Sequence, residues 1–165
     1  MDVQDIGISH MDPAVSGQLL QLESELAYYH ELGFRHVEIN PSRFHLIVHG
    51  QLRLKQLANF AAVLENFDLR YSLHSISRLN LAYDPRLELC NQIMRSQIEI
   101  CRAIHATCLV YHSGLQSLEA IYHGYGGRKS LYSDAELSAG VLREQEALRM
   151  HARMAAEAGM IIGLI

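Results

Sequence analysis

The hydrophobic positions along the chain alternate between two periods. Short runs rich in β-branched and other apolar residues occur five times, and we expect a β-strand at each of them. Between these runs, apolar residues recur at intervals of three and four, which is the pattern of one buried helix face. The expected strands cover residues 5–10, 35–40, 70–75, 107–112 and 160–165.

The four segments between the expected strands also carry the signals that begin and end helices. Gly33 follows the first apolar stripe and is a typical residue just past a helix end, while Asp84-Pro85 places proline in the first turn of the third helix. Ser133 with Glu136 three residues later has the spacing of a capping box at the start of the fourth. The apolar stripes of the first three are Leu19, Leu22, Leu26 and Tyr29, then Leu54, Leu57, Ala61 and Leu64, then Leu89, Ile93, Ile100 and Ile104.

Regular alternation of strands and helices predicts βαβ units and a parallel sheet, that is, an α/β fold. No linker, charge run or change of composition divides residues 1–165, so we expect a single domain. By count alone, five strands and four helices would also suit a complete, non-catalytic α/β domain of flavodoxin-like size with an open sheet.

Composition and charge narrow the class of protein. Hydrophobic residues make up 49% of the 165-residue chain and charged residues 19%, which is typical of an ordered globular domain. Lys and Arg number 14 against 18 Asp and Glu, and the net charge of −4 disfavours nucleic acid as a partner, because it supplies no basic field for a phosphate backbone. No segment has the apolar length of a membrane span or a targeting signal, so we expect no membrane association. The three cysteines lack paired C-x-x-C spacing, which fits a reducing, cytoplasmic location without disulfides.

Polar residues occur where the expected strands end. The strand ends carry His10, Glu38 with Asn40, His74 and His112. Ligand sites of parallel α/β folds form at the carboxyl ends of strands, and neutral imidazole is a good ligand for zinc, iron, manganese or cobalt. His74 and His112 stand at matching positions on neighbouring strands, which favours a metal or substrate role for this pair.

A structural role is the alternative for each of the other strand-end residues. A single strand-end histidine such as His10 is more often a hydrogen-bonded structural residue than a ligand. Glu38 points to the inside of the sheet if Val37 and Ile39 face the helices, where it either binds substrate or pairs with a polar neighbour. For most of the remaining histidines we expect solvated surface positions; these are His30, His36, His45, His49, His105, His123 and His151.

The glycine-rich segment 121–130 is similar to a phosphate-binding loop but does not fit its pattern. Arg128 occupies the position that the second glycine of G-x-x-x-x-G-K-[ST] requires. The segment is either a plain surface loop or a lid that brings Arg128 and Lys129 to an anionic substrate group.

Three segments together resemble the xylose isomerase-like (β/α)8 barrel superfamily, which contains sugar phosphate isomerases and epimerases and the endonuclease IV-like nucleases. They are GFRHVEI at 33–39, YSLH at 71–74 followed by Asn80-Leu81, and LVYHSG at 109–114. Residues 159–165 resemble the fifth strand, which in this family runs directly into a Glu-Asn pair. Five strand starts spaced about 30 to 50 residues apart project to the ~250 residues of a full barrel. The resemblance therefore implies a partial TIM barrel, the N-terminal half, with five parallel strands and four helices.

The resemblance also implies a function. It makes His74 and His112 ligands of a divalent ion (zinc, manganese, magnesium or cobalt) and makes the small-molecule substrate a carbohydrate. Glu38 matches an acid often seen near that substrate, and we expect His10, Asn40 and Arg128 to contribute to the same pocket. The implied activity is sugar or sugar phosphate isomerisation or epimerisation, and the alternative is an apurinic-site endonuclease.

Two further expectations follow from the family's missing parts. The acids of strands five to eight would lie after Ile165, so we expect this chain alone to lack turnover. The first and last strands would each leave an edge unpaired, and we expect self-association there.

Overall fold

The fold is described from a computed structural model that covers residues 7–10, 18–76, 79–82, 87–114 and 133–165, with only the backbone of His10. Every statement about structure below concerns these residues. Within them, no helix combines the length and apolarity that crossing a membrane requires.

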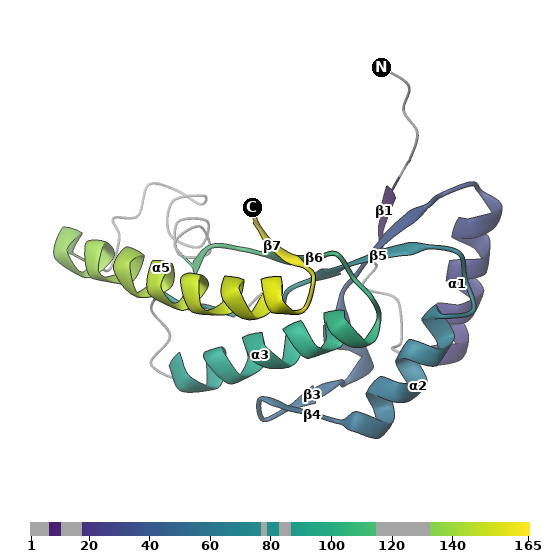
Figure 1. Ribbon diagram of the computed structural model, residues 1–165, viewed down its shortest axis with the longest axis horizontal. Helices are drawn as coiled ribbons and strands as arrows, with labels where there is room; N and C mark the ends of the chain where they lie inside the picture. The colour runs from purple at the N-terminus through teal and green to yellow at the C-terminus, as the bar shows by residue number, and fades with distance from the viewer. Residues whose placement is uncertain (1–6, 11–17, 77–78, 83–86, 115–132) are drawn as a thin grey trace, which may run out of the picture.

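A five-stranded parallel sheet forms the centre of the chain (Figure 1). Its strands are β1 (Gly7–His10), β2 (His36–Ile39), β5 (Arg70–His74), β6 (Cys108–Tyr111) and β7 (Ile161–Leu164). They lie side by side in the order in which they occur in the chain. The five strands predicted from the apolar runs are therefore confirmed. The last four are each shorter than expected by one or two residues, and β1 is described from Gly7 onward.

Four α-helices in the described residues connect these strands: α1 (Leu19–Glu31), α2 (Leu54–Leu64), α3 (Leu87–Ala103) and α5 (Asp134–Glu157). Gly33 follows α1 with a φ of 88°, a conformation that glycine adopts without strain. The Ser133 side chain caps α5 while Glu136 bonds back to the Ser133 backbone, which confirms the predicted capping box. The predicted helix start at Asp84-Pro85 lies outside the described residues.

Between β2 and α2 the chain forms three short elements that the hydrophobic pattern did not predict. These are the 3₁₀ helix η1 (Pro41–Phe44) and a hairpin of β3 (Ile47–Val48) and β4 (Gln51–Leu52). His49 and Gly50 both have positive φ at the two-residue turn, the conformation that matches the twist of a hairpin. Elements of two to four residues are too short to show a period, which is why sequence reasoning missed them.

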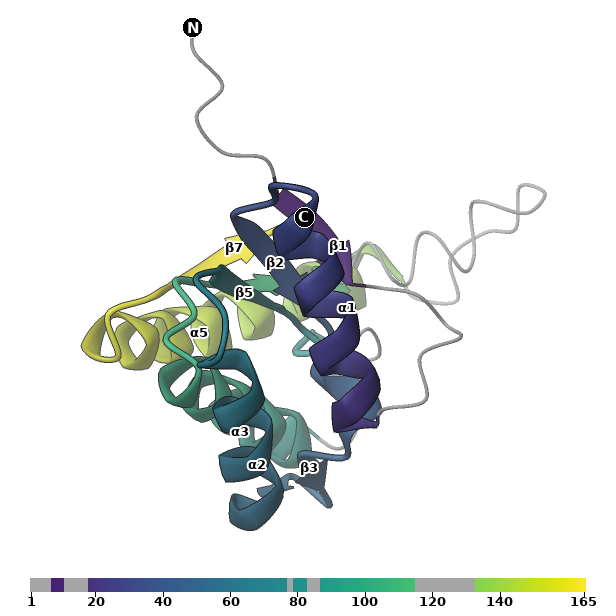
Figure 2. The same ribbon diagram turned by 90° about the vertical axis from the view of Figure 1, so that its right-hand side faces the viewer.

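The strand order excludes a doubly wound, flavodoxin-like sheet. Such a sheet reverses strand order at a switch point and carries helices on both faces. Here the order is sequential, and α1 packs on α2, α2 on α3 and α3 on α5, so that the helices follow one another along one side of the sheet (Figures 1 and 2). This is the arrangement of half a (β/α)8 barrel, open at β1 and β7 in the described part of the chain.

The hydrophobic core lies between the helices and one face of the sheet. Alternate strand residues Val37, Ile39, Leu73, Leu109 and Tyr111 are fully buried there. Each such side chain contributes about 1.5–3 kcal/mol through burial. The intervening residues of the same strands are largely polar and face the inside of the half-barrel, because neighbouring residues of a strand point to opposite faces. All three cysteines are free thiols, and Cys90 and Cys101 belong to this core.

Candidate functional site

The inner face of the sheet carries a continuous line of three polar side chains from three adjacent strands. Nδ1 of His74, at the end of β5, lies 2.9 Å from Oε1 of Glu38 on β2. Nε2 of the same ring lies 2.8 Å from Nε2 of His112, the first residue after β6. His74 is 6% exposed, and the Glu38 side chain is 25% exposed. The structure therefore brings Glu38, His74 and His112 together at the carboxyl ends of the strands.

This line runs diagonally across the sheet. Glu38 is in register with Ser72, two residues before His74. His74 in turn is in register with Val110, two residues before His112. Each side chain thus contacts a residue about 7 Å further along the next strand. The expectation that His74 and His112 occupy matching positions is wrong by two residues, and this offset lets the two rings meet end to end.

The hydrogen bonds of the line follow from the chemistry of its members. A carboxylate only accepts, so Nδ1 of His74 donates to Glu38, and in a neutral pair Nε2 of His74 accepts from Nε2 of His112. Burial and the neighbouring His74 lower the pKa of His112, and the Glu38 charge offsets part of that effect. His112 is therefore a neutral imidazole at pH 7, which is the state in which histidine binds a metal.

Two hydroxyl groups on the inner face were missed by sequence reasoning. The Ser9 hydroxyl on β1 donates to Oε1 of Glu38 at 3.1 Å, so that β1 also contributes to the line. The Ser72 hydroxyl lies 2.9 Å from Nε2 of His36. Serines at alternate strand positions are a weak sequence signal, because the same spacing occurs on any half-solvated strand.

A buried carboxylate on α5 was also missed. Glu144 is 5% exposed and accepts hydrogen bonds from the Tyr111 hydroxyl, the Ser113 hydroxyl and the backbone N–H of Gly114. Its position could have been found from the sequence, because Glu144 lies four residues after Gly140 and three before Ala147 on the buried stripe of α5.

The remaining predicted site residues are placed less directly. His10 ends β1 in register with Ile39, and its side chain is outside the described part. The Asn40 side chain is 9% exposed, and its Oδ1 accepts from the backbone N–H of Ser42, which caps η1. Arg128 lies outside the described residues.

A surface position was expected for most of seven further histidines. Of these, His151 is buried. It is 0% exposed and bonds to Asn91. His30, His45, His49 and His105 are exposed as predicted, whereas His36 is partly buried and His123 is not described.

The His74–His112 pair fits part of a metal site. Two imidazole nitrogens meet at one point, and a carboxylate holds the far nitrogen of His74, as it commonly does for metal-binding histidines. Two nitrogens on one tetrahedral zinc ion lie about 3.3 Å apart, so the rings would separate slightly from their hydrogen-bonded distance. Among the described residues no group of three or more His, Cys, Asp or Glu side chains is arranged to hold a metal. The pair therefore fits as two ligands of a larger set.

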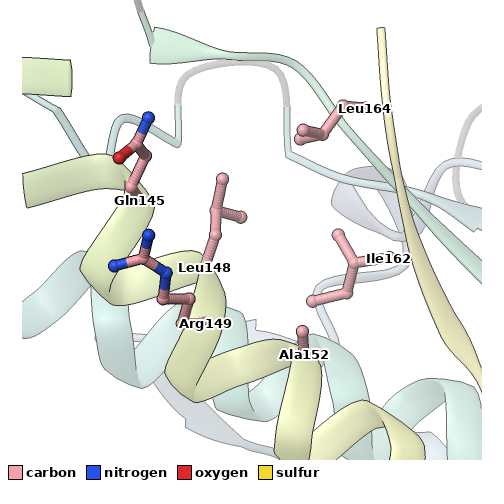
Figure 3. Close-up of a pocket in the computed structure, with 6 residues that line it drawn as sticks. All are labelled: Gln145, Leu148, Arg149, Ala152, Ile162 and Leu164. Atoms are coloured by element: carbon pink, nitrogen blue, oxygen red, sulfur yellow. The ribbon is translucent and has the colours of Figure 1, made fainter. Parts of the chain in front are cut away.

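A cavity of about 290 Å³ lies between α5 and β7, away from this line (Figure 3). Leu148, Ala152, Ile162 and Leu164 give it an apolar lining, and the Arg149 head group points away from the strand. Ile162 is in register with Leu109 and therefore shares the helix-facing side of the sheet. The cavity is thus on the opposite face of the sheet from His74.

Comparison with known proteins shows the fold. A scan against protein-family models and a search of curated proteins found no match. Among solved structures, a D-tagatose 3-epimerase-like protein superposes with a TM-score of 0.64 at 20% identity, over 96% of this chain and 51% of that one. A D-psicose 3-epimerase from Clostridium cellulolyticum H10, solved with D-tagatose, gives a TM-score of 0.65 at 14% identity, over 94% and 50%. A 3-keto-D-glucoside 4-epimerase from E. coli gives 0.66 at 14%, over 97% and 54%.

The chain therefore spans about half the length of the solved structures that it matches. At these identities the shared feature is the fold. The agreement with half of each epimerase chain is consistent with the N-terminal half of a barrel, as the family resemblance implies.

Proposed function

We propose that this chain forms the N-terminal half of a divalent-metal-dependent sugar or sugar phosphate isomerase or epimerase. The observation that carries the proposal is the meeting of the His74 and His112 Nε2 atoms, 2.8 Å apart, at the carboxyl ends of adjacent strands. The epimerase fold of the solved structures supports the same reaction class. A carbohydrate is the substrate that this class implies.

In this proposal each member of the line has its own role. His74 and His112 would hold the ion, which when bound polarises the carbonyl and neighbouring hydroxyl of the sugar. Glu38 holds the proton on Nδ1 of His74 and thereby keeps Nε2 directed at the site. Asn40 and Arg128 are proposed to contact the substrate. His10 is not proposed for this role, because its backbone is in register with Ile39 of the helix-facing side.

We propose that the chain by itself binds metal without turning over a sugar. Moving a proton between two carbons needs a general base and a general acid near the reacting atoms. Glu38 is occupied by His74 and Ser9, and Glu144 is enclosed by its three donors. Glu144 is therefore not free to exchange a proton with a substrate, and we propose that Glu38, whose Oε1 takes both of its bonds, holds His74 rather than acts as the base. The chain also spans only half of the epimerases it resembles.

The test is a calorimetric titration of the chain with Zn²⁺ and Co²⁺ at pH 7.5. Because each histidine supplies one ligand, we expect His74→Ala and His112→Ala each to weaken binding at least tenfold. His30→Ala is the matched control, since His30 is an exposed histidine on α1. Far-UV circular dichroism of each variant separates a lost ligand from a lost fold.

Unchanged metal affinity in a folded His112→Ala variant would contradict the proposal. The nuclease alternative stays a prediction that the net charge of −4 disfavours. Nicking of an abasic duplex by the metal-loaded chain, with no binding of sugars, would reverse the order of the two.

A further inference from the structure

The most enclosed carboxylate in the described chain is on α5, beside the proposed site rather than within it. Glu144 accepts from the Tyr111 hydroxyl at 2.8 Å and from the Gly114 N–H at 2.6 Å through Oε1. Its Oε2 accepts from the Ser113 hydroxyl at 2.9 Å. All three donors belong to residues 111–114, the segment that contains His112.

A buried charge needs such a set of donors to be tolerated. Removing a carboxylate from water costs several kcal/mol unless hydrogen bonds replace its hydration. An apolar residue would fill the same place on the α5 stripe without that cost. The presence of Glu144 therefore indicates that its hydrogen bonds to the end of β6 matter beyond packing.

These bonds fix the backbone on both sides of His112. Tyr111 and Ser113 both bond to Glu144, while the His112 ring points to the opposite face and reaches His74. The two hydroxyl bonds thus anchor residues 111–113 on the helix-facing side of the sheet. The neighbouring strands hold the β6 backbone up to Tyr111, through Ser75 N–H to the Val110 carbonyl and Ile165 N–H to the Tyr111 carbonyl. Glu144 adds the side-chain anchor for the residues on either side of His112, whose backbone sets the Cβ position of that ring.

Through the Tyr111 hydroxyl, which donates to it, Glu144 is also linked to the loop that follows β5. The Tyr111 hydroxyl accepts from the backbone N–H of Leu81 at 3.2 Å. Gly114 packs closely on the Asn80 side chain, because a Cβ added there would lie 2.8 Å from its Cγ. The loops after the strands of His74 and His112 are therefore held against each other.

We infer that Glu144 is a positioning residue that sets the His112 ring against His74. The inference rests on the proposed function of the same strand-end site, for which the spacing of the two rings decides whether they bind one ion. Residues that orient metal ligands typically change affinity by 10- to 100-fold when they are replaced.

The experiment measures the His–His contact directly. In ¹⁵N-labelled chain, a scalar coupling between the His74 and His112 Nε2 nuclei is observable only while their hydrogen bond exists. The variants are Ser113→Ala, which removes one donor, and Glu144→Met, which removes the carboxylate. Glu144→Gln is the conservative variant, because its oxygen can still accept and its NH₂ can donate to Ser113. Tyr71→Phe is the matched control, since this buried hydroxyl bonds to Leu64 instead.

We expect the coupling to be lost in Glu144→Met, weakened in Ser113→Ala, and retained in Glu144→Gln and Tyr71→Phe. Zinc affinity should fall at least tenfold in Glu144→Met and remain within twofold of wild type in Tyr71→Phe. If Glu144→Met does not fold, Ser113→Ala still gives the answer. A wild-type chain without the coupling would overturn the inference. So would unchanged coupling in every one of the two variants Ser113→Ala and Glu144→Met that folds.

The two proposals can fail separately. If the wild-type chain shows the coupling but binds no Zn²⁺ or Co²⁺, the proposed function fails and the positioning role of Glu144 is still tested by the coupling. If the chain binds the metal and the Ser113 and Glu144 variants bind it equally well, the positioning role fails and the proposed function stands.

Discussion

Lowering the pH should destabilise this fold through a single buried histidine between α3 and α5. The His151 side chain is 0% exposed, and its Nε2 lies 2.9 Å from Oδ1 of Asn91. Because an amide oxygen only accepts, Nε2 carries the hydrogen and Nδ1 is bare. Nδ1 has no hydrogen-bond partner among the described residues. A second proton would therefore be added at a buried atom with nothing to accept it.

The magnitude follows from the shift in pKa. Burial, and to a smaller degree the Arg95 charge, lowers the pKa of His151 from 6.5 to about 4. Between these values the unfolded chain binds the proton and the folded chain does not, so the free energy of unfolding falls as the pH falls. The loss from this one group is about 2 kcal/mol at pH 5 and about 3 kcal/mol at pH 4. It is absent above about pH 7, where both states are neutral.

The assay is urea unfolding at pH values from 7.5 to 4.5, followed by far-UV circular dichroism because the chain has no tryptophan. His151→Gln is the matched control, since its side-chain NH₂ can keep the bond to Asn91 and does not titrate. We expect the two chains to have similar stability at pH 7.5, and the variant to be about 2 kcal/mol more stable at pH 5 relative to that starting difference. Curves that remain parallel over the whole range would refute the reasoning, because Arg95 and every other titrating group is common to both chains.

Two further predictions concern close packing and the open edge of the sheet. Gly114→Ala should lower the free energy of unfolding by about 1–3 kcal/mol in urea unfolding, because the new Cβ overlaps the Asn80 side chain. Gly7→Ala is the control, since its Cβ would make only ordinary contacts, and it should leave stability nearly unchanged. Equal effects of the two substitutions would contradict the packing argument. The chain should self-associate through the β7 edge, where Leu164 is 60% exposed. In sedimentation velocity, Leu164→Lys should shift the chain towards monomer, while Leu20→Lys on α1 should not. A wild-type chain that stays monomeric at about 100 μM would count against the prediction.

Strand and helix positions could be predicted from the sequence because each element buries one face against the same core. The buried residues of α1, Leu22 and Leu26, and of β2, Val37 and Ile39, are the ones that the two periods select. The same logic failed for η1 and the β3–β4 hairpin, whose two to four residues show no period. The hairpin's signal was instead local, a histidine followed by a glycine at a tight turn.

Buried polar residues were harder to predict than apolar ones. His151 and Glu144 lie on the buried stripe of α5, spaced seven residues apart, yet their polarity suggests solvent when each is considered alone. Their burial depends on partners from other elements, Asn91 on α3 and Tyr111 on β6, which no single segment reveals. The helical period was the available signal, and it should outweigh residue type when every other member of a stripe is small or apolar.

The site shows why strand ends alone do not specify a geometry. The sequence places Glu38, His74 and His112 at the ends of successive strands, but rings at matching positions of parallel strands would stand side by side, with their Cβ atoms about 5 Å apart. The observed register instead offsets each residue by two positions from the next. The Glu38 side chain therefore contacts the His74 ring, and the His74 ring contacts the His112 ring, each diagonally across the gap between two strands. A stagger of register between neighbouring strands is also what closing a parallel sheet into a barrel requires. The end-to-end contact of His74 and His112 therefore depends on the register of β5 with β6 as much as on the two residues, and a register that paired His74 with His112 directly would not form it.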